Sequence, residues 1–185
     1  MPQKISDFIY RITNPVSVLI ISLIFCLYVF YILPNSADVD RIIGESLLFP
    51  MFKYLVYAPV DFYGQLDAYG SDGRAEFVSY RIIHATLWLL TLGGFLALST
   101  SALLRYALSS DNGLLRLNLV APLPSLFDFL ENQLQNILVL LYPDRFDALA
   151  VLAAIFTAIK WVTLLLAFLI LFYALGRALV ARLSR

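Results

Sequence analysis

Four long apolar segments, separated by short polar stretches and one long connection, form the main pattern of the chain. They lie at about residues 15–33, 81–104, 119–142 and 148–175. Each segment can cross the roughly 30 Å hydrocarbon core of a bilayer as a helix, which takes about twenty residues. The last segment is roughly 42 Å long at 1.5 Å per residue, so it must tilt or project from a membrane. The pattern predicts an all-α, polytopic membrane four-helix bundle, with residues 1–185 in a single domain.

Helix-start signals refine the second and third segments. The second segment is expected to continue a helix that begins near Gly73, with Asp72 or Gly73 as its N-cap. The third segment carries Pro122 and Pro124 at its start, where the missing amide hydrogen of proline is tolerated. The first segment is too long for the apolar core of a signal peptide, and we expect it to be retained.

The long connection at residues 34–80 is predicted to be an external loop that carries a short interfacial helix. Within it, the sequence LLFPMFKYLVYAP is apolar and aromatic but too short to cross a bilayer. Its aromatic residues Phe49, Phe52, Tyr54 and Tyr57 suit a helix that lies on the outer membrane surface. The same composition suits a lid over the bundle, so both interpretations stay open here.

Polar side chains at helical spacing interrupt the third apolar segment. They are Asp128, Glu131, Asn132, Gln135 and Asn136, which share one face of a helix. An ionised side chain that faces lipid costs several kcal/mol, so this face must point toward protein or trapped water. We therefore predict a buried polar site on this helix.

Helical rise predicts which charge meets the buried carboxylates. Counted inward from the outer end of the third segment, Glu131 lies roughly 16 Å and Asp128 roughly 21 Å deep. Lys160, counted inward along the fourth segment, lies roughly 20 Å deep. The short turn at 143–147 makes the two helices antiparallel neighbours. We expect Lys160 to form an ion pair with Asp128 or Glu131, with Thr157 beside it in the same site.

The buried charges leave two interpretations open. Asp128 and Glu131 carry two negative charges and Lys160 carries one positive charge, so one negative charge is in surplus. Either burial and the like-charged neighbour keep one acid protonated, or a proton, cation or ligand group completes the site. In the other interpretation, a buried ion pair simply fixes the register of two helices, with no chemistry attached.

A second polar stripe lies where the second apolar segment begins. It contains Arg74, Arg81 and His84, with Phe77 and Trp88 at the same helical spacing. The stripe predicts a polar path from the outer face toward the buried site. In the simpler alternative, the arginines are solvated or bind lipid phosphates, and a lone histidine is a weak indicator of a ligand or a base.

The distribution of charge predicts the orientation in the membrane. If the N-terminus is cytoplasmic, the inner side has a basic excess. Its acidic residues are Asp7 and Asp111, and its basic residues are Lys4, Arg11, Arg105, Arg116, Arg177, Arg182 and Arg185. The outer side then has an acidic excess. Basic residues near the ends of membrane spans stay in the cytoplasm. We therefore predict a multi-pass protein of the bacterial plasma (inner) membrane with both termini in the cytoplasm.

Composition narrows the classes of function. Hydrophobic residues make up 61% of the chain, charged residues 14%, and mean hydropathy is +0.83, outside the range of soluble domains. The formal net charge is zero, which argues against nucleic acid, because phosphate binding needs a basic excess. One histidine and one cysteine suit neither a metal site nor a bound cofactor. The expected partners are membrane lipids, other membrane subunits or further copies of the chain.

Two motifs frame the buried polar residues. The first is an LP pair before D-x-x-E-N, and the second is T-x-x-K-W on the last helix; the matching residues are Leu123, Pro124, Asp128, Glu131, Asn132, Thr157, Lys160 and Trp161. They resemble the motifs of an uncharacterised family of small four-helix bacterial integral membrane proteins. The family's G-x-x-G-R-x-x-Y is similar to the segment at Gly70, Gly73 and Arg74, although Phe77 stands where tyrosine is expected and His84 where an acid is expected. The resemblance implies a membrane bundle and no known activity.

Two functions of different classes follow from these residues. The first is a non-catalytic bundle that binds a lipid or hydrophobic ligand, or serves as a subunit of a larger membrane complex. The alternative is an intramembrane enzyme that acts on a lipid or isoprenoid-like substrate by Asp/Glu acid–base chemistry. In that case Lys160 or Arg81 would stabilise developing negative charge. No nucleophile or cofactor motif accompanies the carboxylates, so no residue is assigned a catalytic role and the first function is favoured.

Overall fold

The computed structural model describes residues 2–32 and 57–184, apart from the side chain of His84. Throughout these ranges the regular elements are helices, as the sequence predicts. Four helical stretches are long and apolar enough to cross a membrane: Pro15–Ile32, Pro59–Ala107, Gly113–Leu141 and Asp147–Leu183. Each covers one predicted apolar segment to within one residue; the second extends beyond its segment at both ends, the third at its start and the fourth mainly at its end.

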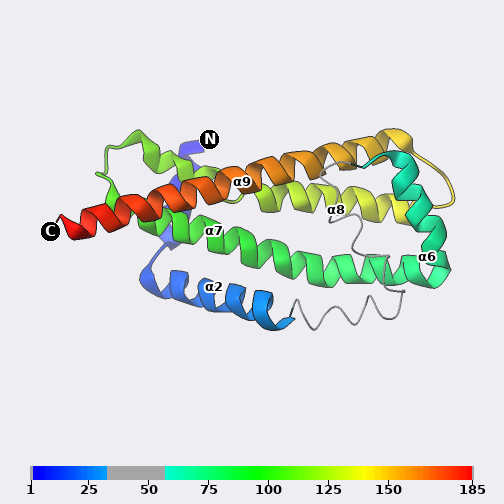
Figure 1. The fold of residues 1–185 in the computed structure, drawn as a ribbon, viewed down its shortest axis with the longest axis horizontal. Coiled ribbons are helices and arrows are strands. Elements are labelled where there is room, and N and C mark those ends of the chain that lie inside the picture. Colours follow the sequence, from blue (N-terminus) through cyan, green and yellow to red (C-terminus); the bar gives the residue numbers. More distant parts are fainter. Residues whose placement is uncertain (1, 33–56, 185) are drawn as a thin grey trace.

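Four helices lie alongside one another in the bundle (Figure 1). They are α2 (Pro15–Leu27, continued by the π-helical turn η1 at Tyr28–Ile32), α7 (Thr86–Ala107), α8 (Leu123–Leu141) and α9 (Asp147–Leu183). The helix α7 lies between α2 and the antiparallel α8–α9 pair. The helix α9 continues beyond the predicted apolar segment because Arg177 and Arg182 end the hydrophobic run without ending the helix.

The two ends of the bundle differ. At one end, here called the terminal end, α1 (Pro2–Ile12), the C-terminal part of α9 and the connection between α7 and α8 lie together. That connection includes the 3₁₀ helix η3 (Gly113–Leu119). At the opposite end, here called the α6 end, α6 (Pro59–Tyr80) runs across the bundle near the α8–α9 turn (Figure 1).

Residues 59–80 are helical, so the helix that the sequence predicts from near Gly73 begins earlier, within the part predicted to be an external loop. Pro59 begins α6 in the first turn, and the Asp61 carboxylate accepts a hydrogen bond from the Ala58 amide at 2.9 Å. Gly70 has φ 64°, a left-handed conformation that costs glycine little, and it kinks the helix there. The predicted N-cap at Asp72 or Gly73 is therefore displaced to a kink at Gly70. The expected interfacial helix lies outside the described residues, except for its last three positions, 57–59.

The interior consists of two apolar clusters. The cluster near the α6 end includes Phe62, Tyr63, Leu66, Phe77, Leu138, Ala150 and Ala153. The cluster nearer the terminal end includes Ile9, Leu92, Leu96, Ala97, Ala121 and Ala167. The outward faces are also apolar: side chains more than half exposed include Leu19, Leu90, Leu140, Leu165 and Phe172. The helix α2 has no buried residue along Pro15–Leu27 and contacts α7 through rings such as Phe25, which stacks on Phe95 at 4.5 Å.

Glycine allows α7 to approach α8 closely. A Cβ atom added at Gly93 would lie 2.7 Å from the Ser125 Oγ and 3.0 Å from its Cβ. Such distances are too short for the short serine side chain to relieve, so the helices themselves would have to move apart. Gly93 therefore sets the spacing between the two helices.

We predict that Gly93→Ala lowers the free energy of unfolding by about 1–3 kcal/mol, because it overpacks the α7–α8 contact. Thermal or denaturant unfolding in detergent micelles measures the effect. The matched control is Gly176→Ala in α9, where nothing lies within 4 Å of an added Cβ. That variant should be neutral or more stable, because alanine favours the helix over glycine by about 1 kcal/mol. Equal effects of the two changes would contradict the close contact.

Candidate functional site

The helix α8 buries its polar face and exposes its apolar face. Asp128, Glu131, Asn132, Gln135 and Asn136 are all buried, and Glu131 and Gln135 are 1% and 0% exposed. On the opposite face, Leu126, Phe129 and Leu140 are exposed. A surface helix of a soluble protein has the reverse arrangement. The predicted polar stripe is thus a polar layer within the bundle.

Lys160 joins α9 to both carboxylates of α8. Its Nζ lies 2.6 Å from Oε2 of Glu131 and 3.1 Å from Oδ1 of Asp128. All three side chains are almost fully enclosed. The predicted ion pair is confirmed, and it involves Asp128 and Glu131 together. Because the three residues lie at the same level of an antiparallel pair, the contact fixes how α8 and α9 are aligned.

Gln135 extends the layer toward the α6 end. Its amide Nε2 donates to Oε1 of Glu131 at 3.1 Å and to the Tyr57 hydroxyl at 2.8 Å. Tyr57 is only 6% exposed and lies in the apolar cluster near the α6 end. For this residue the structure favours the lid over the interfacial anchor. Thr157 is fully buried one turn from Lys160, and its hydroxyl donates to the Ala153 carbonyl at 3.1 Å.

Arg81 joins the polar layer from the chain segment before α7. It begins the π-helical turn η2 (Arg81–Ala85), is 3% exposed, and donates a hydrogen bond from Nη1 to the Asn132 side-chain oxygen. A π turn changes which way successive side chains face, and such turns are frequent at functional sites. Buried Arg81 also balances the charge, with two acids and two bases in the layer. The surplus negative charge inferred from the sequence is therefore wrong, because that count left Arg81 outside the buried site.

Arg74 belongs to a different contact. Its Nη1 donates to the Leu66 carbonyl at 2.9 Å, and its guanidinium lies 4.2 Å from the Tyr142 ring centroid. Nearby, Asp67 accepts hydrogen bonds from the Tyr142 hydroxyl and from Arg145, which ties α6 to the α8–α9 turn. The hydrogen bond to Asp67 raises the pKa of Tyr142 above its ordinary value. The arginines of the predicted outer stripe are thus separated.

His84, the third member of that stripe, lies within η2. The position of its side chain is outside the described part of the structure. The structure therefore brings Arg81 to the polar layer and Arg74 to the α8–α9 turn, and it leaves the predicted role of His84 untested.

Two buried acceptors in the polar layer have no hydrogen-bond partner among the described groups. They are the side-chain oxygens Oε1 of Gln135 and Oδ1 of Asn136. The two residues are 0% and 8% exposed. A buried acceptor without a donor costs about 1–3 kcal/mol, so each oxygen calls for a donor from another source. The chemistry that suits them is a hydroxyl, ammonium or amide hydrogen.

The contact of Tyr57 with the site is the part that the spacing of polar residues does not reveal. Tyr57 reaches Gln135 across the fold from a position just before α6, at a sequence distance of 78 residues. Arg81 did carry a signal, because an arginine at the edge of an apolar segment needs a partner if it is buried. Within the described chain, no group of three or more histidine, cysteine, aspartate or glutamate residues is placed to hold a metal ion.

Comparison with protein-family models, with curated proteins and with solved structures found no match for this chain. The resemblance carried by the D-x-x-E-N and T-x-x-K-W motifs stays a prediction.

We predict that Lys160→Met lowers the free energy of unfolding by about 3–5 kcal/mol, because it leaves two buried carboxylates without their cation. Adding Glu131→Gln should restore part of that loss, since the double variant carries one fewer uncompensated charge. Denaturant unfolding of the two single variants and the double variant in detergent measures the coupling.

The control for this cycle is the exposed ion pair between Arg145 and Asp67, whose atoms lie 3.1 Å apart. Arg145→Met should cost no more than about 1 kcal/mol, because solvent screens the pair. If Lys160→Met were as mild as Arg145→Met, the buried ion pair would not determine the stability of the bundle.

Proposed function

We propose that this chain is a polytopic membrane protein that binds a membrane lipid or a similar amphiphile at its buried polar layer, without catalysing a reaction on it. The long apolar helices and the exposed apolar side chains on their outward faces support membrane insertion. The absence of any buried residue along α2 adds support, because an apolar helix in water would need a protein surface to cover it.

The proposed location is the bacterial plasma membrane, with both termini in the cytoplasm. Two observations support this orientation. The terminal end holds both α1 and the C-terminal part of α9 (Figure 1), and it carries exposed basic residues such as Lys4, Arg116 and Arg182. Basic residues near membrane spans favour the cytoplasmic side.

This topology predicts which segments are accessible from each side of the membrane. A cysteine placed at Ser110, in the α7–α8 connection, should react with a membrane-impermeant thiol reagent only after the cells are opened. A cysteine at Asp144, in the α8–α9 turn, should react in intact cells. Cys26→Ser removes the native thiol as background. The reverse pattern would invert the orientation, and labelling of both sites in intact cells would refute the proposed topology.

The unpartnered oxygens of Gln135 and Asn136 are the observation that carries the lipid-binding proposal. Both are acceptors, so the bound group must supply donors, as the hydroxyl or ammonium of a lipid headgroup does. The polar layer borders the apolar cluster that contains Leu138 and Val139, which suits contact with an acyl chain.

The charge balance supports binding over catalysis. Lys160 contacts both carboxylates, and Arg81 supplies a second buried positive charge. General acid–base catalysis needs one acid and one base that exchange protons with a substrate. Here both acids are engaged by a permanent partner within the bundle, which suits a fixed scaffold for a bound headgroup.

Asn136→Leu tests the proposal, because it removes one unpartnered acceptor and breaks no hydrogen bond observed among the described residues. If a lipid donor binds this oxygen, the variant should retain less lipid through purification, as measured by native mass spectrometry and lipid extraction. Thr163→Val is the matched control. It is equally buried at 8% exposed, but its hydroxyl donates only to carbonyls of its own helix, those of Ile159 and Lys160.

Four outcomes would count against non-catalytic lipid binding at the polar layer. Equal lipid retention in Asn136→Leu and Thr163→Val would place the lipid elsewhere. A stability gain of about 1–3 kcal/mol in Asn136→Leu without any bound lipid would mark the oxygen as truly unpaired. Recovery of a chemically altered lipid would favour the alternative of an intramembrane enzyme, and a stoichiometric protein partner would favour a subunit of a larger complex.

A further inference from the structure

The N-terminal helix α1 has three distinct faces. Ser6 and Ile9 are buried against the bundle, at 1% and 8% exposed. Ile5, Phe8 and Ile12 form an apolar stripe in which each side chain is 42–55% exposed. The remaining face is polar and carries exposed Lys4, Asp7 and Arg11. By helical spacing, the polar face lies nearly opposite the buried face, and the apolar stripe lies between them, roughly 100° from each.

Polar contacts fix α1 on the terminal end of the bundle. The Ser6 hydroxyl donates to the side-chain oxygen of Asn118 at 2.8 Å, and the Asn118 amide donates in turn to the Ser101 hydroxyl at 3.3 Å. Arg105, in the last turn of α7, donates to the Tyr10 carbonyl at 2.7 Å near the C-terminus of α1. A cation at that position suits the helix dipole. The orientation of α1 is therefore set by the fold.

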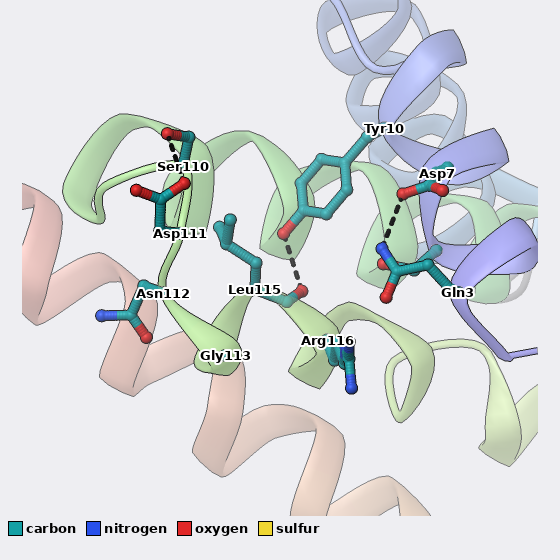
Figure 2. Close-up of a pocket in the computed structure, with 10 residues that line it drawn as sticks. Gln3, Asp7, Tyr10, Ser110, Asp111, Asn112, Gly113, Leu115 and Arg116 are labelled. Carbon is teal, nitrogen blue, oxygen red and sulfur yellow. Dashed lines mark hydrogen bonds between the residues drawn. The ribbon is translucent and has the colours of Figure 1, made fainter.

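Figure 2 shows the polar side of this contact. Tyr10 reaches across to the connection between α7 and α8, where its hydroxyl donates to the Leu115 carbonyl at 2.8 Å. Gln3 and Asp7 line a cavity of about 210 Å³ with the residues of that connection. Burial raises the pKa of Tyr10 to about 12, so this hydroxyl keeps its proton and remains a donor at physiological pH. The polar face of α1 thus lies toward water, beside a polar connection.

We propose that α1 is an interfacial helix that inserts Ile5, Phe8 and Ile12 among the lipids at the terminal end and binds anionic headgroups. The inference rests on the proposed insertion of the bundle in a membrane. Helix α1 runs across the axis of the bundle (Figure 1), which lays it parallel to a bilayer surface. A helix with one apolar and one basic polar face binds a membrane surface in this orientation.

Charge complementarity selects anionic lipid as the occupant. Among the described residues, the exposed basic side chains of the terminal end are Lys4, Arg11, Arg105, Arg116, Arg177 and Arg182, and the exposed acidic ones are Asp7 and Asp111. Basic residues next to a membrane span attract the negatively charged lipids of the cytoplasmic leaflet. The exposed apolar stripe alone would suit any lipid, so the preference for anionic headgroups comes from this excess.

A fluorescent label on the full-length protein tests the inference. Cysteines replace Phe8 on the apolar stripe, Asp7 on the polar face, and Leu140 on the outward face of α8, each with Cys26→Ser. The proteins are reconstituted in phosphatidylcholine vesicles with and without phosphatidylglycerol. Nitroxide groups at shallow and deep positions of the lipid, and iodide in the water, serve as quenchers.

The label at position 8 should be quenched by shallow nitroxides and protected from iodide, more strongly when phosphatidylglycerol is present. The label at position 7, one residue away on the same helix, should be quenched by iodide. The double change Lys4→Gln and Arg11→Gln is then made in the protein labelled at position 8. In vesicles with phosphatidylglycerol it should lower the ratio of membrane-bound to water-exposed α1 about five-fold per charge removed.

The label at position 140 separates failure of this inference from failure of the proposed function. Deep quenching at 140 together with iodide quenching at 8 would overturn the interfacial role of α1 and leave the membrane bundle intact. Iodide quenching at 140 would overturn membrane insertion itself. Equal lipid quenching at 8 in both kinds of vesicle would overturn the selection of anionic headgroups.

Discussion

The contact of Lys160 with Asp128 and Glu131 is the constraint on which the rest of the bundle depends. Removing three charged groups from water is costly, and the cost is offset only while the ammonium stays within hydrogen-bonding distance of both carboxylates. A slip of one turn between α8 and α9 would separate them by about 5 Å. The alignment fixed here also brings Leu138 and Val139 of α8 into one apolar cluster with Ala153 and Ala154 of α9.

The other helices are positioned around that pair by contacts of decreasing burial. Arg81 attaches the start of α7 to Asn132 within the polar layer, and Gly93 lets α7 approach α8 closely farther along. Across the α6 end, the contacts of Asp67 with Tyr142 and Arg145 are exposed and therefore weaker. The helix α2, which has no buried residue, is held mainly by aromatic and aliphatic contacts with α7. The bundle is thus most tightly specified at α8 and α9 and least at α2.

Periodicity predicts much of this fold, because a polar face on an apolar helix can be buried only against polar groups of a neighbouring helix. The spacing from Asp128 to Asn136 and the depth of Lys160 suffice to predict the ion pair. The helix at 59–80 escapes the same reasoning, since its kink at Gly70 and its mixed composition disrupt any single period. Arg81 is reached by periodicity only in part: its helical spacing predicts a polar path toward the buried site, but places Arg74 in the same path, whereas the structure takes Arg74 to the α8–α9 turn. The hydrogen bond between Gln135 and Tyr57 joins residues far apart in sequence, so no local pattern predicts it.

The lengths of the elements connect the polar layer to the two transverse helices. With 19 residues, α8 is about 28 Å long, close to the roughly 30 Å hydrocarbon core of a bilayer. Helices α1 and α6 run across the bundle near the two ends of α8 (Figure 1), at the levels where headgroups would lie. Glu131 then lies roughly 12 Å and Asp128 roughly 8 Å from the nearer end of α8, both within the hydrocarbon core, where an unpaired charge is costly. The same depth that makes Lys160 indispensable to the carboxylates makes the unpartnered oxygens of Gln135 and Asn136 strong acceptors, because little water competes for them.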